Sequence, residues 1–203
     1  MTQTVTALYD TYDDAISATR ALEEAGIPAS DISVVSNNAD NRYDREHASN
    51  AAEDAGKGAG IGAVVGGVGG LLTGLGLMAI PGVGPVVAAG WLVATAVGAA
   101  GGAVVGGAAG GLVGSLTGAG VPEHDANFYA EGVRRGGTLV AARVPDGQAP
   151  LAREILARYR WVDPAERSAA YRRSGWTTFD ENAAVYTPEQ IAAERARYTR
   201  EHV

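Results

Sequence analysis

Residues 98–118 read GAAGGAVVGGAAGGLVGSLTG, and their regular glycine spacing constrains the fold more than any other stretch of the chain. A second run with the same spacing, GAGIGAVVGGVGGLLTG, occupies residues 58–74. Glycine at every fourth position lies along one face of a helix, with a slow drift around it. The glycines of this predicted helix-packing face are Gly58, Gly62, Gly66, Gly70, Gly74, Gly98, Gly102, Gly106, Gly110, Gly114 and Gly118.

The turn between the two runs is marked by IPGVGP at residues 80–85, whose prolines and glycines break helices. We therefore predict two helices, over residues 58–80 and 86–118, folded as a glycine-zipper hairpin. Glycine in a helix costs roughly 1 kcal/mol per position relative to alanine. Close approach of helix backbones offsets this cost through dispersion contacts, so we expect the glycine face to drive self-association.

Charged residues divide the chain into three segments. Residues 58–122 carry none, a run of 65 residues, whereas residues 1–57 carry four basic and eleven acidic side chains and residues 123–203 carry twelve of each sign. Two environments fit the uncharged segment. It could be a membrane hairpin, because residues 61–80 are long enough for the roughly 30 Å of a bilayer core. It could also pack against copies of itself in a soluble homo-oligomer.

The two flanks read as halves of one α+β domain. Residues 4–9 and 32–36 predict strands on either side of a helix over residues 12–25. Residues 138–144 predict a third strand, preceded by a helix over 123–135 and followed by one over 150–159. This order is most of a ferredoxin-like (split β-α-β) domain, interrupted by the hairpin, with its fourth strand missing or hidden.

The predicted organisation has four parts. Residues 1–57 and 121–162 form the two halves of the α+β domain, residues 58–120 form the hairpin, and residues 163–203 form a C-terminal helical arm. The arm carries Trp176, Phe179 and Tyr186 in a polar stretch with few other anchors. Such aromatics either dock on their own domain or engage a neighbouring subunit. We expect the contact with a neighbouring subunit.

Nothing in the sequence names a reaction. The absence of cysteine excludes thiolate catalysis and cysteine-bound metals, and the three histidines lie far apart. The acidic residues Asp10, Asp13 and Asp14 fit a helix start better than a divalent-ion site. A net charge of −7 argues against nucleic-acid binding. We predict no catalytic residue, metal or cofactor. The predicted partner is the chain itself, and membrane lipid is the second candidate partner.

Residues 5–37, VTALYDTYDDAISATRALEEAGIPASDISVVSN, resemble the N-terminal domain of the bacterial general stress protein 17M-like (heat-induced stress protein) family. The glycine zipper, GGTLVAARV at residues 136–144 and WVDPAERSAAYRRSGW at residues 161–176 are similar to the longer proteobacterial members. The resemblance implies a stress-associated protein without assigned chemistry.

These observations predict a non-enzymatic stress-associated protein that self-associates through its glycine-zipper hairpin, at or in the cytoplasmic membrane. Two alternatives remain open. One is a soluble homo-oligomeric scaffold or shell protein, and the other is a ferredoxin-like module that binds a small ligand in the crevice of its sheet. The first residues lack the basic region and apolar run of a signal peptide, so we expect the cytoplasm or the cytoplasmic membrane and no secretion.

Overall fold

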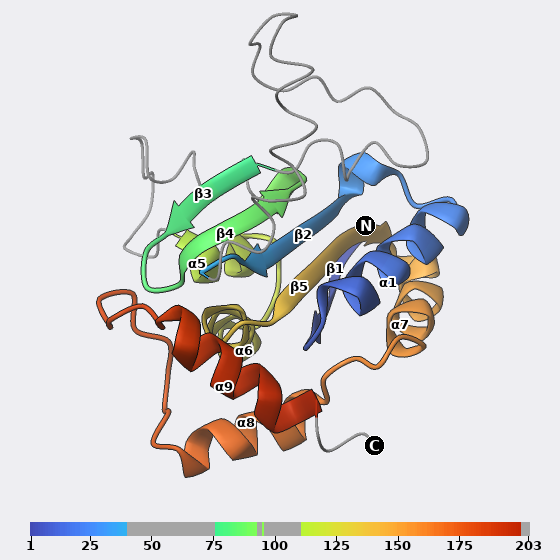
Figure 1. The fold of residues 1–203 in the computed structure, drawn as a ribbon. Coiled ribbons are helices and arrows are strands. Elements are labelled where there is room, and N and C mark those ends of the chain that lie inside the picture. Colours follow the sequence, from blue (N-terminus) through green and yellow to red (C-terminus); the bar gives the residue numbers. More distant parts are fainter. Residues whose placement is uncertain (40–75, 93–94, 96–110, 200–203) are drawn as a thin grey trace, which may run out of the picture.

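The protein is built on one antiparallel sheet of five strands in the order β1-β5-β2-β4-β3 (Figure 1). The computed structural model describes residues 1–39, 76–92, 95 and 111–199. The strand bounds are β1 Thr2–Tyr9, β2 Ile32–Asn37, β3 Gly76–Ile80, β4 Gly84–Ala89 and β5 Thr138–Pro145. The expected α+β class is thus confirmed, and strands lie at all three predicted places.

Helices cover both faces of the sheet. On one face lie α1 (Tyr12–Glu24) and α7 (Ala149–Ala157), and on the other lie α5 (Gly111–Gly118) and α6 (Glu123–Arg134). The C-terminal arm adds α8 (Pro164–Arg173) and α9 (Pro188–Thr199), which pack against α6 on the side away from α1 (Figure 1). The sheet is therefore the middle layer of three.

The alternation of side chains along the strands divides the core into two clusters. Val34 of β2 and Val140 of β5 are paired and point toward α1 and α7, whereas their neighbours Val35 and Leu139 are paired and point toward α6. All four side chains are at most 1% exposed. Because both faces of β2 and β5 are covered, these strands read as near-continuous apolar runs in the sequence.

The N-terminal half forms a β-α-β unit as predicted. Thr11 caps α1, since its hydroxyl oxygen accepts a hydrogen bond from the Asp14 amide at 3.2 Å. β5 lies between β1 and β2 and is antiparallel to both, so β1 and β2 run parallel to each other. The ferredoxin-like assignment stays a prediction, because the strand order contains two further strands beyond this unit.

The predicted helical hairpin is wrong where the structure describes its central part. Residues 76–80 and 84–89 are the strands β3 and β4, joined by a tight turn in which Gly82 and Gly84 have positive φ angles of 71° and 98°. β4 pairs with β2 from Val34↔Ala89 to Asn37↔Val86, and so supplies the strand that the sequence left hidden. The prolines and glycines of residues 80–85 suit a β-turn as well as a helix end. The hairpin forms because the edge of β2 that faces away from β5 needs hydrogen-bond partners, which β4 supplies.

The strands β3 and β4 also bear on the predicted membrane hairpin. Among the residues that the structure describes, no helix is both long enough and apolar enough to cross a bilayer. The predicted span over residues 61–80 is interrupted, because its last five residues form β3. The later part of the uncharged segment does contain a helix at a predicted place, since residues 111–118 form α5.

Gly90 offers a test that separates the sheet from the helical hairpin. It follows β4 with φ +94°, and a Cβ built on it would overlap the carbonyl oxygen of Ile32 and lie 2.7 Å from Cα of Ser33. We expect Gly90→Ala to lower the free energy of unfolding in urea by about 2 kcal/mol or more, because rigid backbone lies in its way. In a helix the same change would stabilise by up to about 1 kcal/mol.

Gly118→Ala is the control for this experiment. Gly118 ends α5, and a Cβ there meets no described atom within 4 Å. The control should therefore change the stability by less than about 1 kcal/mol. A stabilised Gly90→Ala variant would contradict the pairing of β4 with β2.

Candidate functional site

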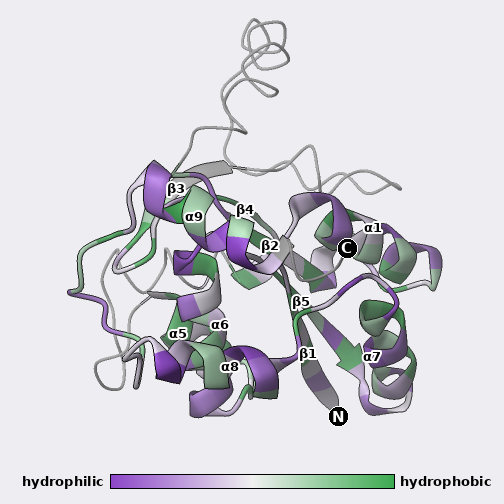
Figure 2. Cartoon of the chain, turned by 60° about the horizontal axis from the view of Figure 1, so that its bottom comes forward, coloured by the Kyte–Doolittle hydropathy of each residue, from purple (hydrophilic) through white to green (hydrophobic). Residues whose placement is uncertain are grey.

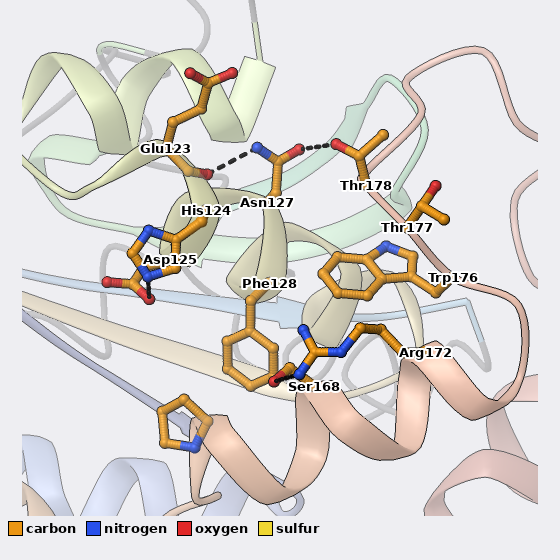
Figure 3. Close-up of a pocket in the computed structure, with 11 residues that line it drawn as sticks. Glu123, His124, Asp125, Asn127, Phe128, Ser168, Arg172, Trp176, Thr177 and Thr178 are labelled. Carbon is orange, nitrogen blue, oxygen red and sulfur yellow. Dashed lines mark hydrogen bonds and ion pairs between the residues drawn. The ribbon is translucent and has the colours of Figure 1, made fainter.

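A hollow in the described surface lies where the C-terminal arm crosses the start of α6. It is a cavity of about 520 Å³ between α6, α8 and the chain that follows α8 (Figure 3). Phe128 and Trp176 present aromatic rings to it, and the charged side chains of Glu123, Asp125 and Arg172 stand around it. We call this hollow the α6–α8 cleft.

The walls of the cleft are fixed by local sequence signals. Asp163 caps α8, because its Oδ1 accepts hydrogen bonds from the amides of Ala165 and Glu166 at 2.8 and 3.0 Å. On α8, the guanidinium of Arg172 donates to the hydroxyl oxygen of Ser168 at 3.3 Å, so both side chains lie on the cleft side of the helix (Figure 3).

Asn127 of α6 ties the arm across the cleft. Its amide nitrogen donates to the carbonyl of Glu123 at 2.7 Å, which leaves its Oδ1 pointing at the arm. That oxygen accepts from the hydroxyl of Thr178 at 2.9 Å (Figure 3). It also accepts from the amide of Phe179 at 3.1 Å. Trp176, just before these residues, packs edge-on against Tyr171 with ring centroids 5.9 Å apart.

The electrostatics of the cleft are mixed. Acidic side chains and His124 come from the first turn of α6, where His124 contacts Asp125 at 2.9 Å, and Arg172 stands across from them on α8. Among the residues described here, no group of three or more histidine, aspartate and glutamate side chains could hold a metal ion. The arrangement suits the binding of a small polar molecule that also has a ring.

A buried ion network joins α9 of the arm to α6. The carboxylate of Glu131 accepts from Arg135 at 2.6 Å and from Arg134 at 3.2 Å, and Arg135 reaches Glu194 of α9 at 3.3 Å. Glu131 is 1% exposed. A buried carboxylate is tolerated only when such partners compensate its lost hydration.

A second buried pair joins α8 to the end of β1. Arg167 donates to both oxygens of Asp10, at 2.6 and 2.7 Å, and its guanidinium lies 3.4 Å from the ring centroid of Tyr198. Burial alone would lower the pKa of the Arg167 guanidinium, but the hydrogen bonds and charge of Asp10 raise it above its usual value. Asp10 therefore faces a permanent cation, and the acidic cluster at the start of α1 has a partner in the arm.

The three aromatic residues predicted to dock the arm all contact their own chain. Phe179 is buried in the core cluster on the α6 side, and Trp176 packs against the same cluster. The ring of Tyr186 lies 5.1 and 5.7 Å from the guanidinium carbons of Arg134 and Arg135. In this single chain the arm thus folds back on its domain, which is the other of the two alternatives that the sequence left open.

The predicted glycine face is only partly within the described residues. Gly114 and Gly118 lie in α5, and the remaining glycines of the face lie outside the described residues. Leu112 and Leu116 are the side chains that α5 buries in the core. Gly118 is exposed.

The ion pairs of the arm were missed from the sequence. Asp10 and Arg167 are 157 positions apart, and Arg135 and Glu194 are 59 apart, so no local pattern links them. One sequence signal could have indicated an ion pair in this network. Glu131 and Arg135 stand four residues apart in a helix that otherwise carries apolar residues inward, which is the spacing of an ion pair on one face.

Fold and site together define a small α+β domain to which a helical arm is fixed by buried ion pairs. Residues 4–83 match the sequence model of a family described as the heat induced stress protein YflT domain. The resemblance to heat-induced stress proteins is confirmed for this part of the chain. The match runs from β1 to the β3–β4 turn. No curated protein and no solved structure matches the chain.

The Arg167–Asp10 pair predicts a measurable coupling between arm and domain. Its side chains are 10% and 17% exposed. We expect Arg167→Met to cost about 3 kcal/mol of unfolding free energy, because it leaves a largely buried carboxylate without a partner. Asp10→Asn should cost a similar amount. The double variant should lose less than the sum of the two, with a coupling of about 1–3 kcal/mol in urea denaturation.

Arg158→Met is the matched control. Its ion pair with Glu154 is short, at 2.6 Å, but the two side chains are 60% and 63% exposed. Solvent screens such a pair, so the control should cost less than about 0.5 kcal/mol. Additive effects of the Arg167 and Asp10 variants would show that the arm is not held by this pair.

Proposed function

We propose that this chain is a non-enzymatic, stress-associated protein that self-associates through the glycine face of which α5 is the described part. One observation supports this proposal above the others. α5 packs on its own domain through Leu112 and Leu116. Gly114 and Gly118 lie two positions further along, which places them about 200° around the helix from these leucines. Among the described residues, α5 therefore packs on the domain through its leucine side, and Gly114 and Gly118 lie on a different side of the helix.

The chemistry of that face favours helix packing between copies. A Cβ on Gly118 would meet nothing within 4 Å among the described residues, so no described neighbour requires glycine there. Glycine at this spacing weakens an isolated helix and gains only where another backbone approaches closely. A second copy presents the same face, and self-complementary contacts of this kind close into symmetric oligomers.

The place of assembly in this proposal is the cytoplasm or the surface of the cytoplasmic membrane. The 65-residue run without charge supports contact with lipid. The pairing of β4 with β2 supports a soluble homo-oligomeric scaffold, because it anchors the middle of that run in the sheet of the domain. Carbonate washing of membranes, followed by light scattering of each fraction, distinguishes the two places of assembly. Retention in the washed membrane supports assembly with lipid, and a large particle in the soluble fraction supports the scaffold.

Leucine on the glycine face should disrupt the assembly. We expect Gly114→Leu with Gly118→Leu to lower the particle mass measured by light scattering at least twofold, because the added side chains hold the helices apart. Gly147→Leu is the control, since a Cβ there also meets no described atom within 4 Å and lies on the other side of β5 from α5. An unchanged mass in a variant with normal circular dichroism would refute association through this face.

The α6–α8 cleft supports a second function, the binding of a small ligand. The sequence placed such a ligand in a crevice of the sheet, whereas the hollow lies between two helices. Aromatic rings, acidic groups on one side and Arg172 on the other suit a small aromatic molecule that carries both charges. Phenylalanine is a simple probe of this kind.

Binding of phenylalanine is measured by amide chemical shifts in a titration. We expect saturable shifts of the α6 and α8 amides. In Arg172→Ala the dissociation constant should be at least tenfold larger, because the carboxylate of phenylalanine loses its guanidinium partner. Arg173→Ala is the matched control, since Arg173 is adjacent and exposed but does not line the cleft. Equal effects of both variants would argue against a site in the cleft.

A further inference from the structure

The outer edge of β1 presents main-chain groups that the sheet does not use. At one end of the strand the Met1 carbonyl accepts from the Asp146 amide at 3.2 Å, on the side of β5. At the other end the Leu8 carbonyl accepts from the Val162 amide at 2.8 Å, on the opposite side. Because successive residues of an antiparallel strand direct their main-chain groups to opposite sides, odd-numbered residues of β1 face β5 and even-numbered residues face outward.

Thr4 and Thr6 are the outward residues in the middle of this edge. The Thr6 carbonyl lies 3.4 Å from the hydroxyl of Tyr129, a long contact. Within the described part of the chain, no hydrogen bond engages the amide of Thr4, the carbonyl of Thr4 or the amide of Thr6. From Tyr9 onward the edge is covered, since Tyr9 forms a bridge with Trp161. The open edge is thus short and has a defined end.

This edge is the floor of a groove of about 400 Å³, which we call the β1 groove. Its floor is Thr4–Ala7, which spans about 13 Å at the usual rise of a strand. Figure 2 shows β1 with α7 on one side of it and α6 on the other. Each wall of the groove combines apolar side chains with one charged residue. The wall on the α6 side is formed by Val121, Pro122, Tyr129 and the charged Asp125. The wall on the α7 side is formed by Leu156, Ala157, Trp161 and the charged Arg153.

We propose that the β1 groove binds an extended apolar segment of another polypeptide, which adds to the sheet as a strand beside β1. Donors and acceptors on alternate residues match the backbone of an extended chain, which is how peptides join a sheet edge. Side chains of such a strand point alternately to the two walls. Because both walls are apolar, successive side chains of the segment should be apolar. This inference is independent of the glycine face of α5.

The walls also argue for a single strand rather than the edge of a second copy. Paired strands lie about 4.8 Å apart. A second copy would bring its own α6 and α7 walls beside its β1, and these would meet the walls of the first copy before the strands could pair. A segment without flanking helices fits between them. The net charge of −7 further favours a segment with basic residues at its ends.

The proposal is tested with the fluorescein-labelled peptide KSVIVSK and the full chain, by fluorescence anisotropy. Thr6→Pro removes an outward amide from the floor while the bonds to β5 use the odd-numbered residues. We expect it to weaken binding at least tenfold. Thr2→Pro is the matched control, because Thr2 faces the same side but lies outside the groove, and it should change the dissociation constant less than twofold.

A second pair of variants leaves the backbone of β1 intact. Ala157→Glu puts a charge on the α7 wall at an exposed position and should weaken binding at least fivefold. Leu151→Glu puts the same charge at an exposed position of the same helix outside the groove, and should leave binding unchanged. Bound peptide should also slow hydrogen exchange of the Thr4 and Thr6 amides at least tenfold.

Four results would overturn the proposal. The first three are absence of peptide binding by the parent chain, binding that Thr6→Pro and Ala157→Glu leave unchanged, and peptide binding without protection of the Thr4 and Thr6 amides. A fourth is a loss of particle mass in Thr6→Pro but not in Thr2→Pro, which would make a second copy the occupant of the edge.

Discussion

The structure depends on one constraint, which is that a strand buried on both faces must have hydrogen-bond partners on both of its edges. β2 is buried along its whole length, so water cannot satisfy its main-chain groups. β5 satisfies one edge and β4 the other. Meeting this requirement draws together segments from the beginning, the middle and the later part of the chain. It also leaves β1 and β3 as the two edges of the sheet.

The same constraint explains how the uncharged segment takes part in the domain. Its central residues enter the sheet as β3 and β4, and its later residues supply α5, whose leucines cover the face that β4 extends. The segment is therefore not simply an insertion that leaves the domain and returns to it. The leucines of α5 contribute to the core, and its glycines Gly114 and Gly118 lie on a different side of the helix.

The arm is held by buried ion pairs in addition to its apolar contacts with the core. α9 is weakly amphipathic, yet it contributes Glu194 to the network of Arg135 and Glu131, while α8 contributes Arg167 to Asp10. Buried ion pairs add little net stability compared with apolar packing, but they penalise any arrangement that leaves one partner alone. The arm therefore has one favoured position, and in that position it forms one wall of the α6–α8 cleft.

The sequence by itself determined the local elements. Local sequence patterns placed β1, α1, β2, α6, β5 and α7 close to their observed bounds, since those signals act within a few residues. It did not determine residues 76–89, where Gly, Val and Pro are compatible with a helix end and with a β-hairpin. Only the unpaired edge of β2 decides between them, and that edge exists only once the sheet has formed. The cleft and the ion pairs depend on the tertiary structure for the same reason, because their partners come from distant elements that local spacing cannot bring together.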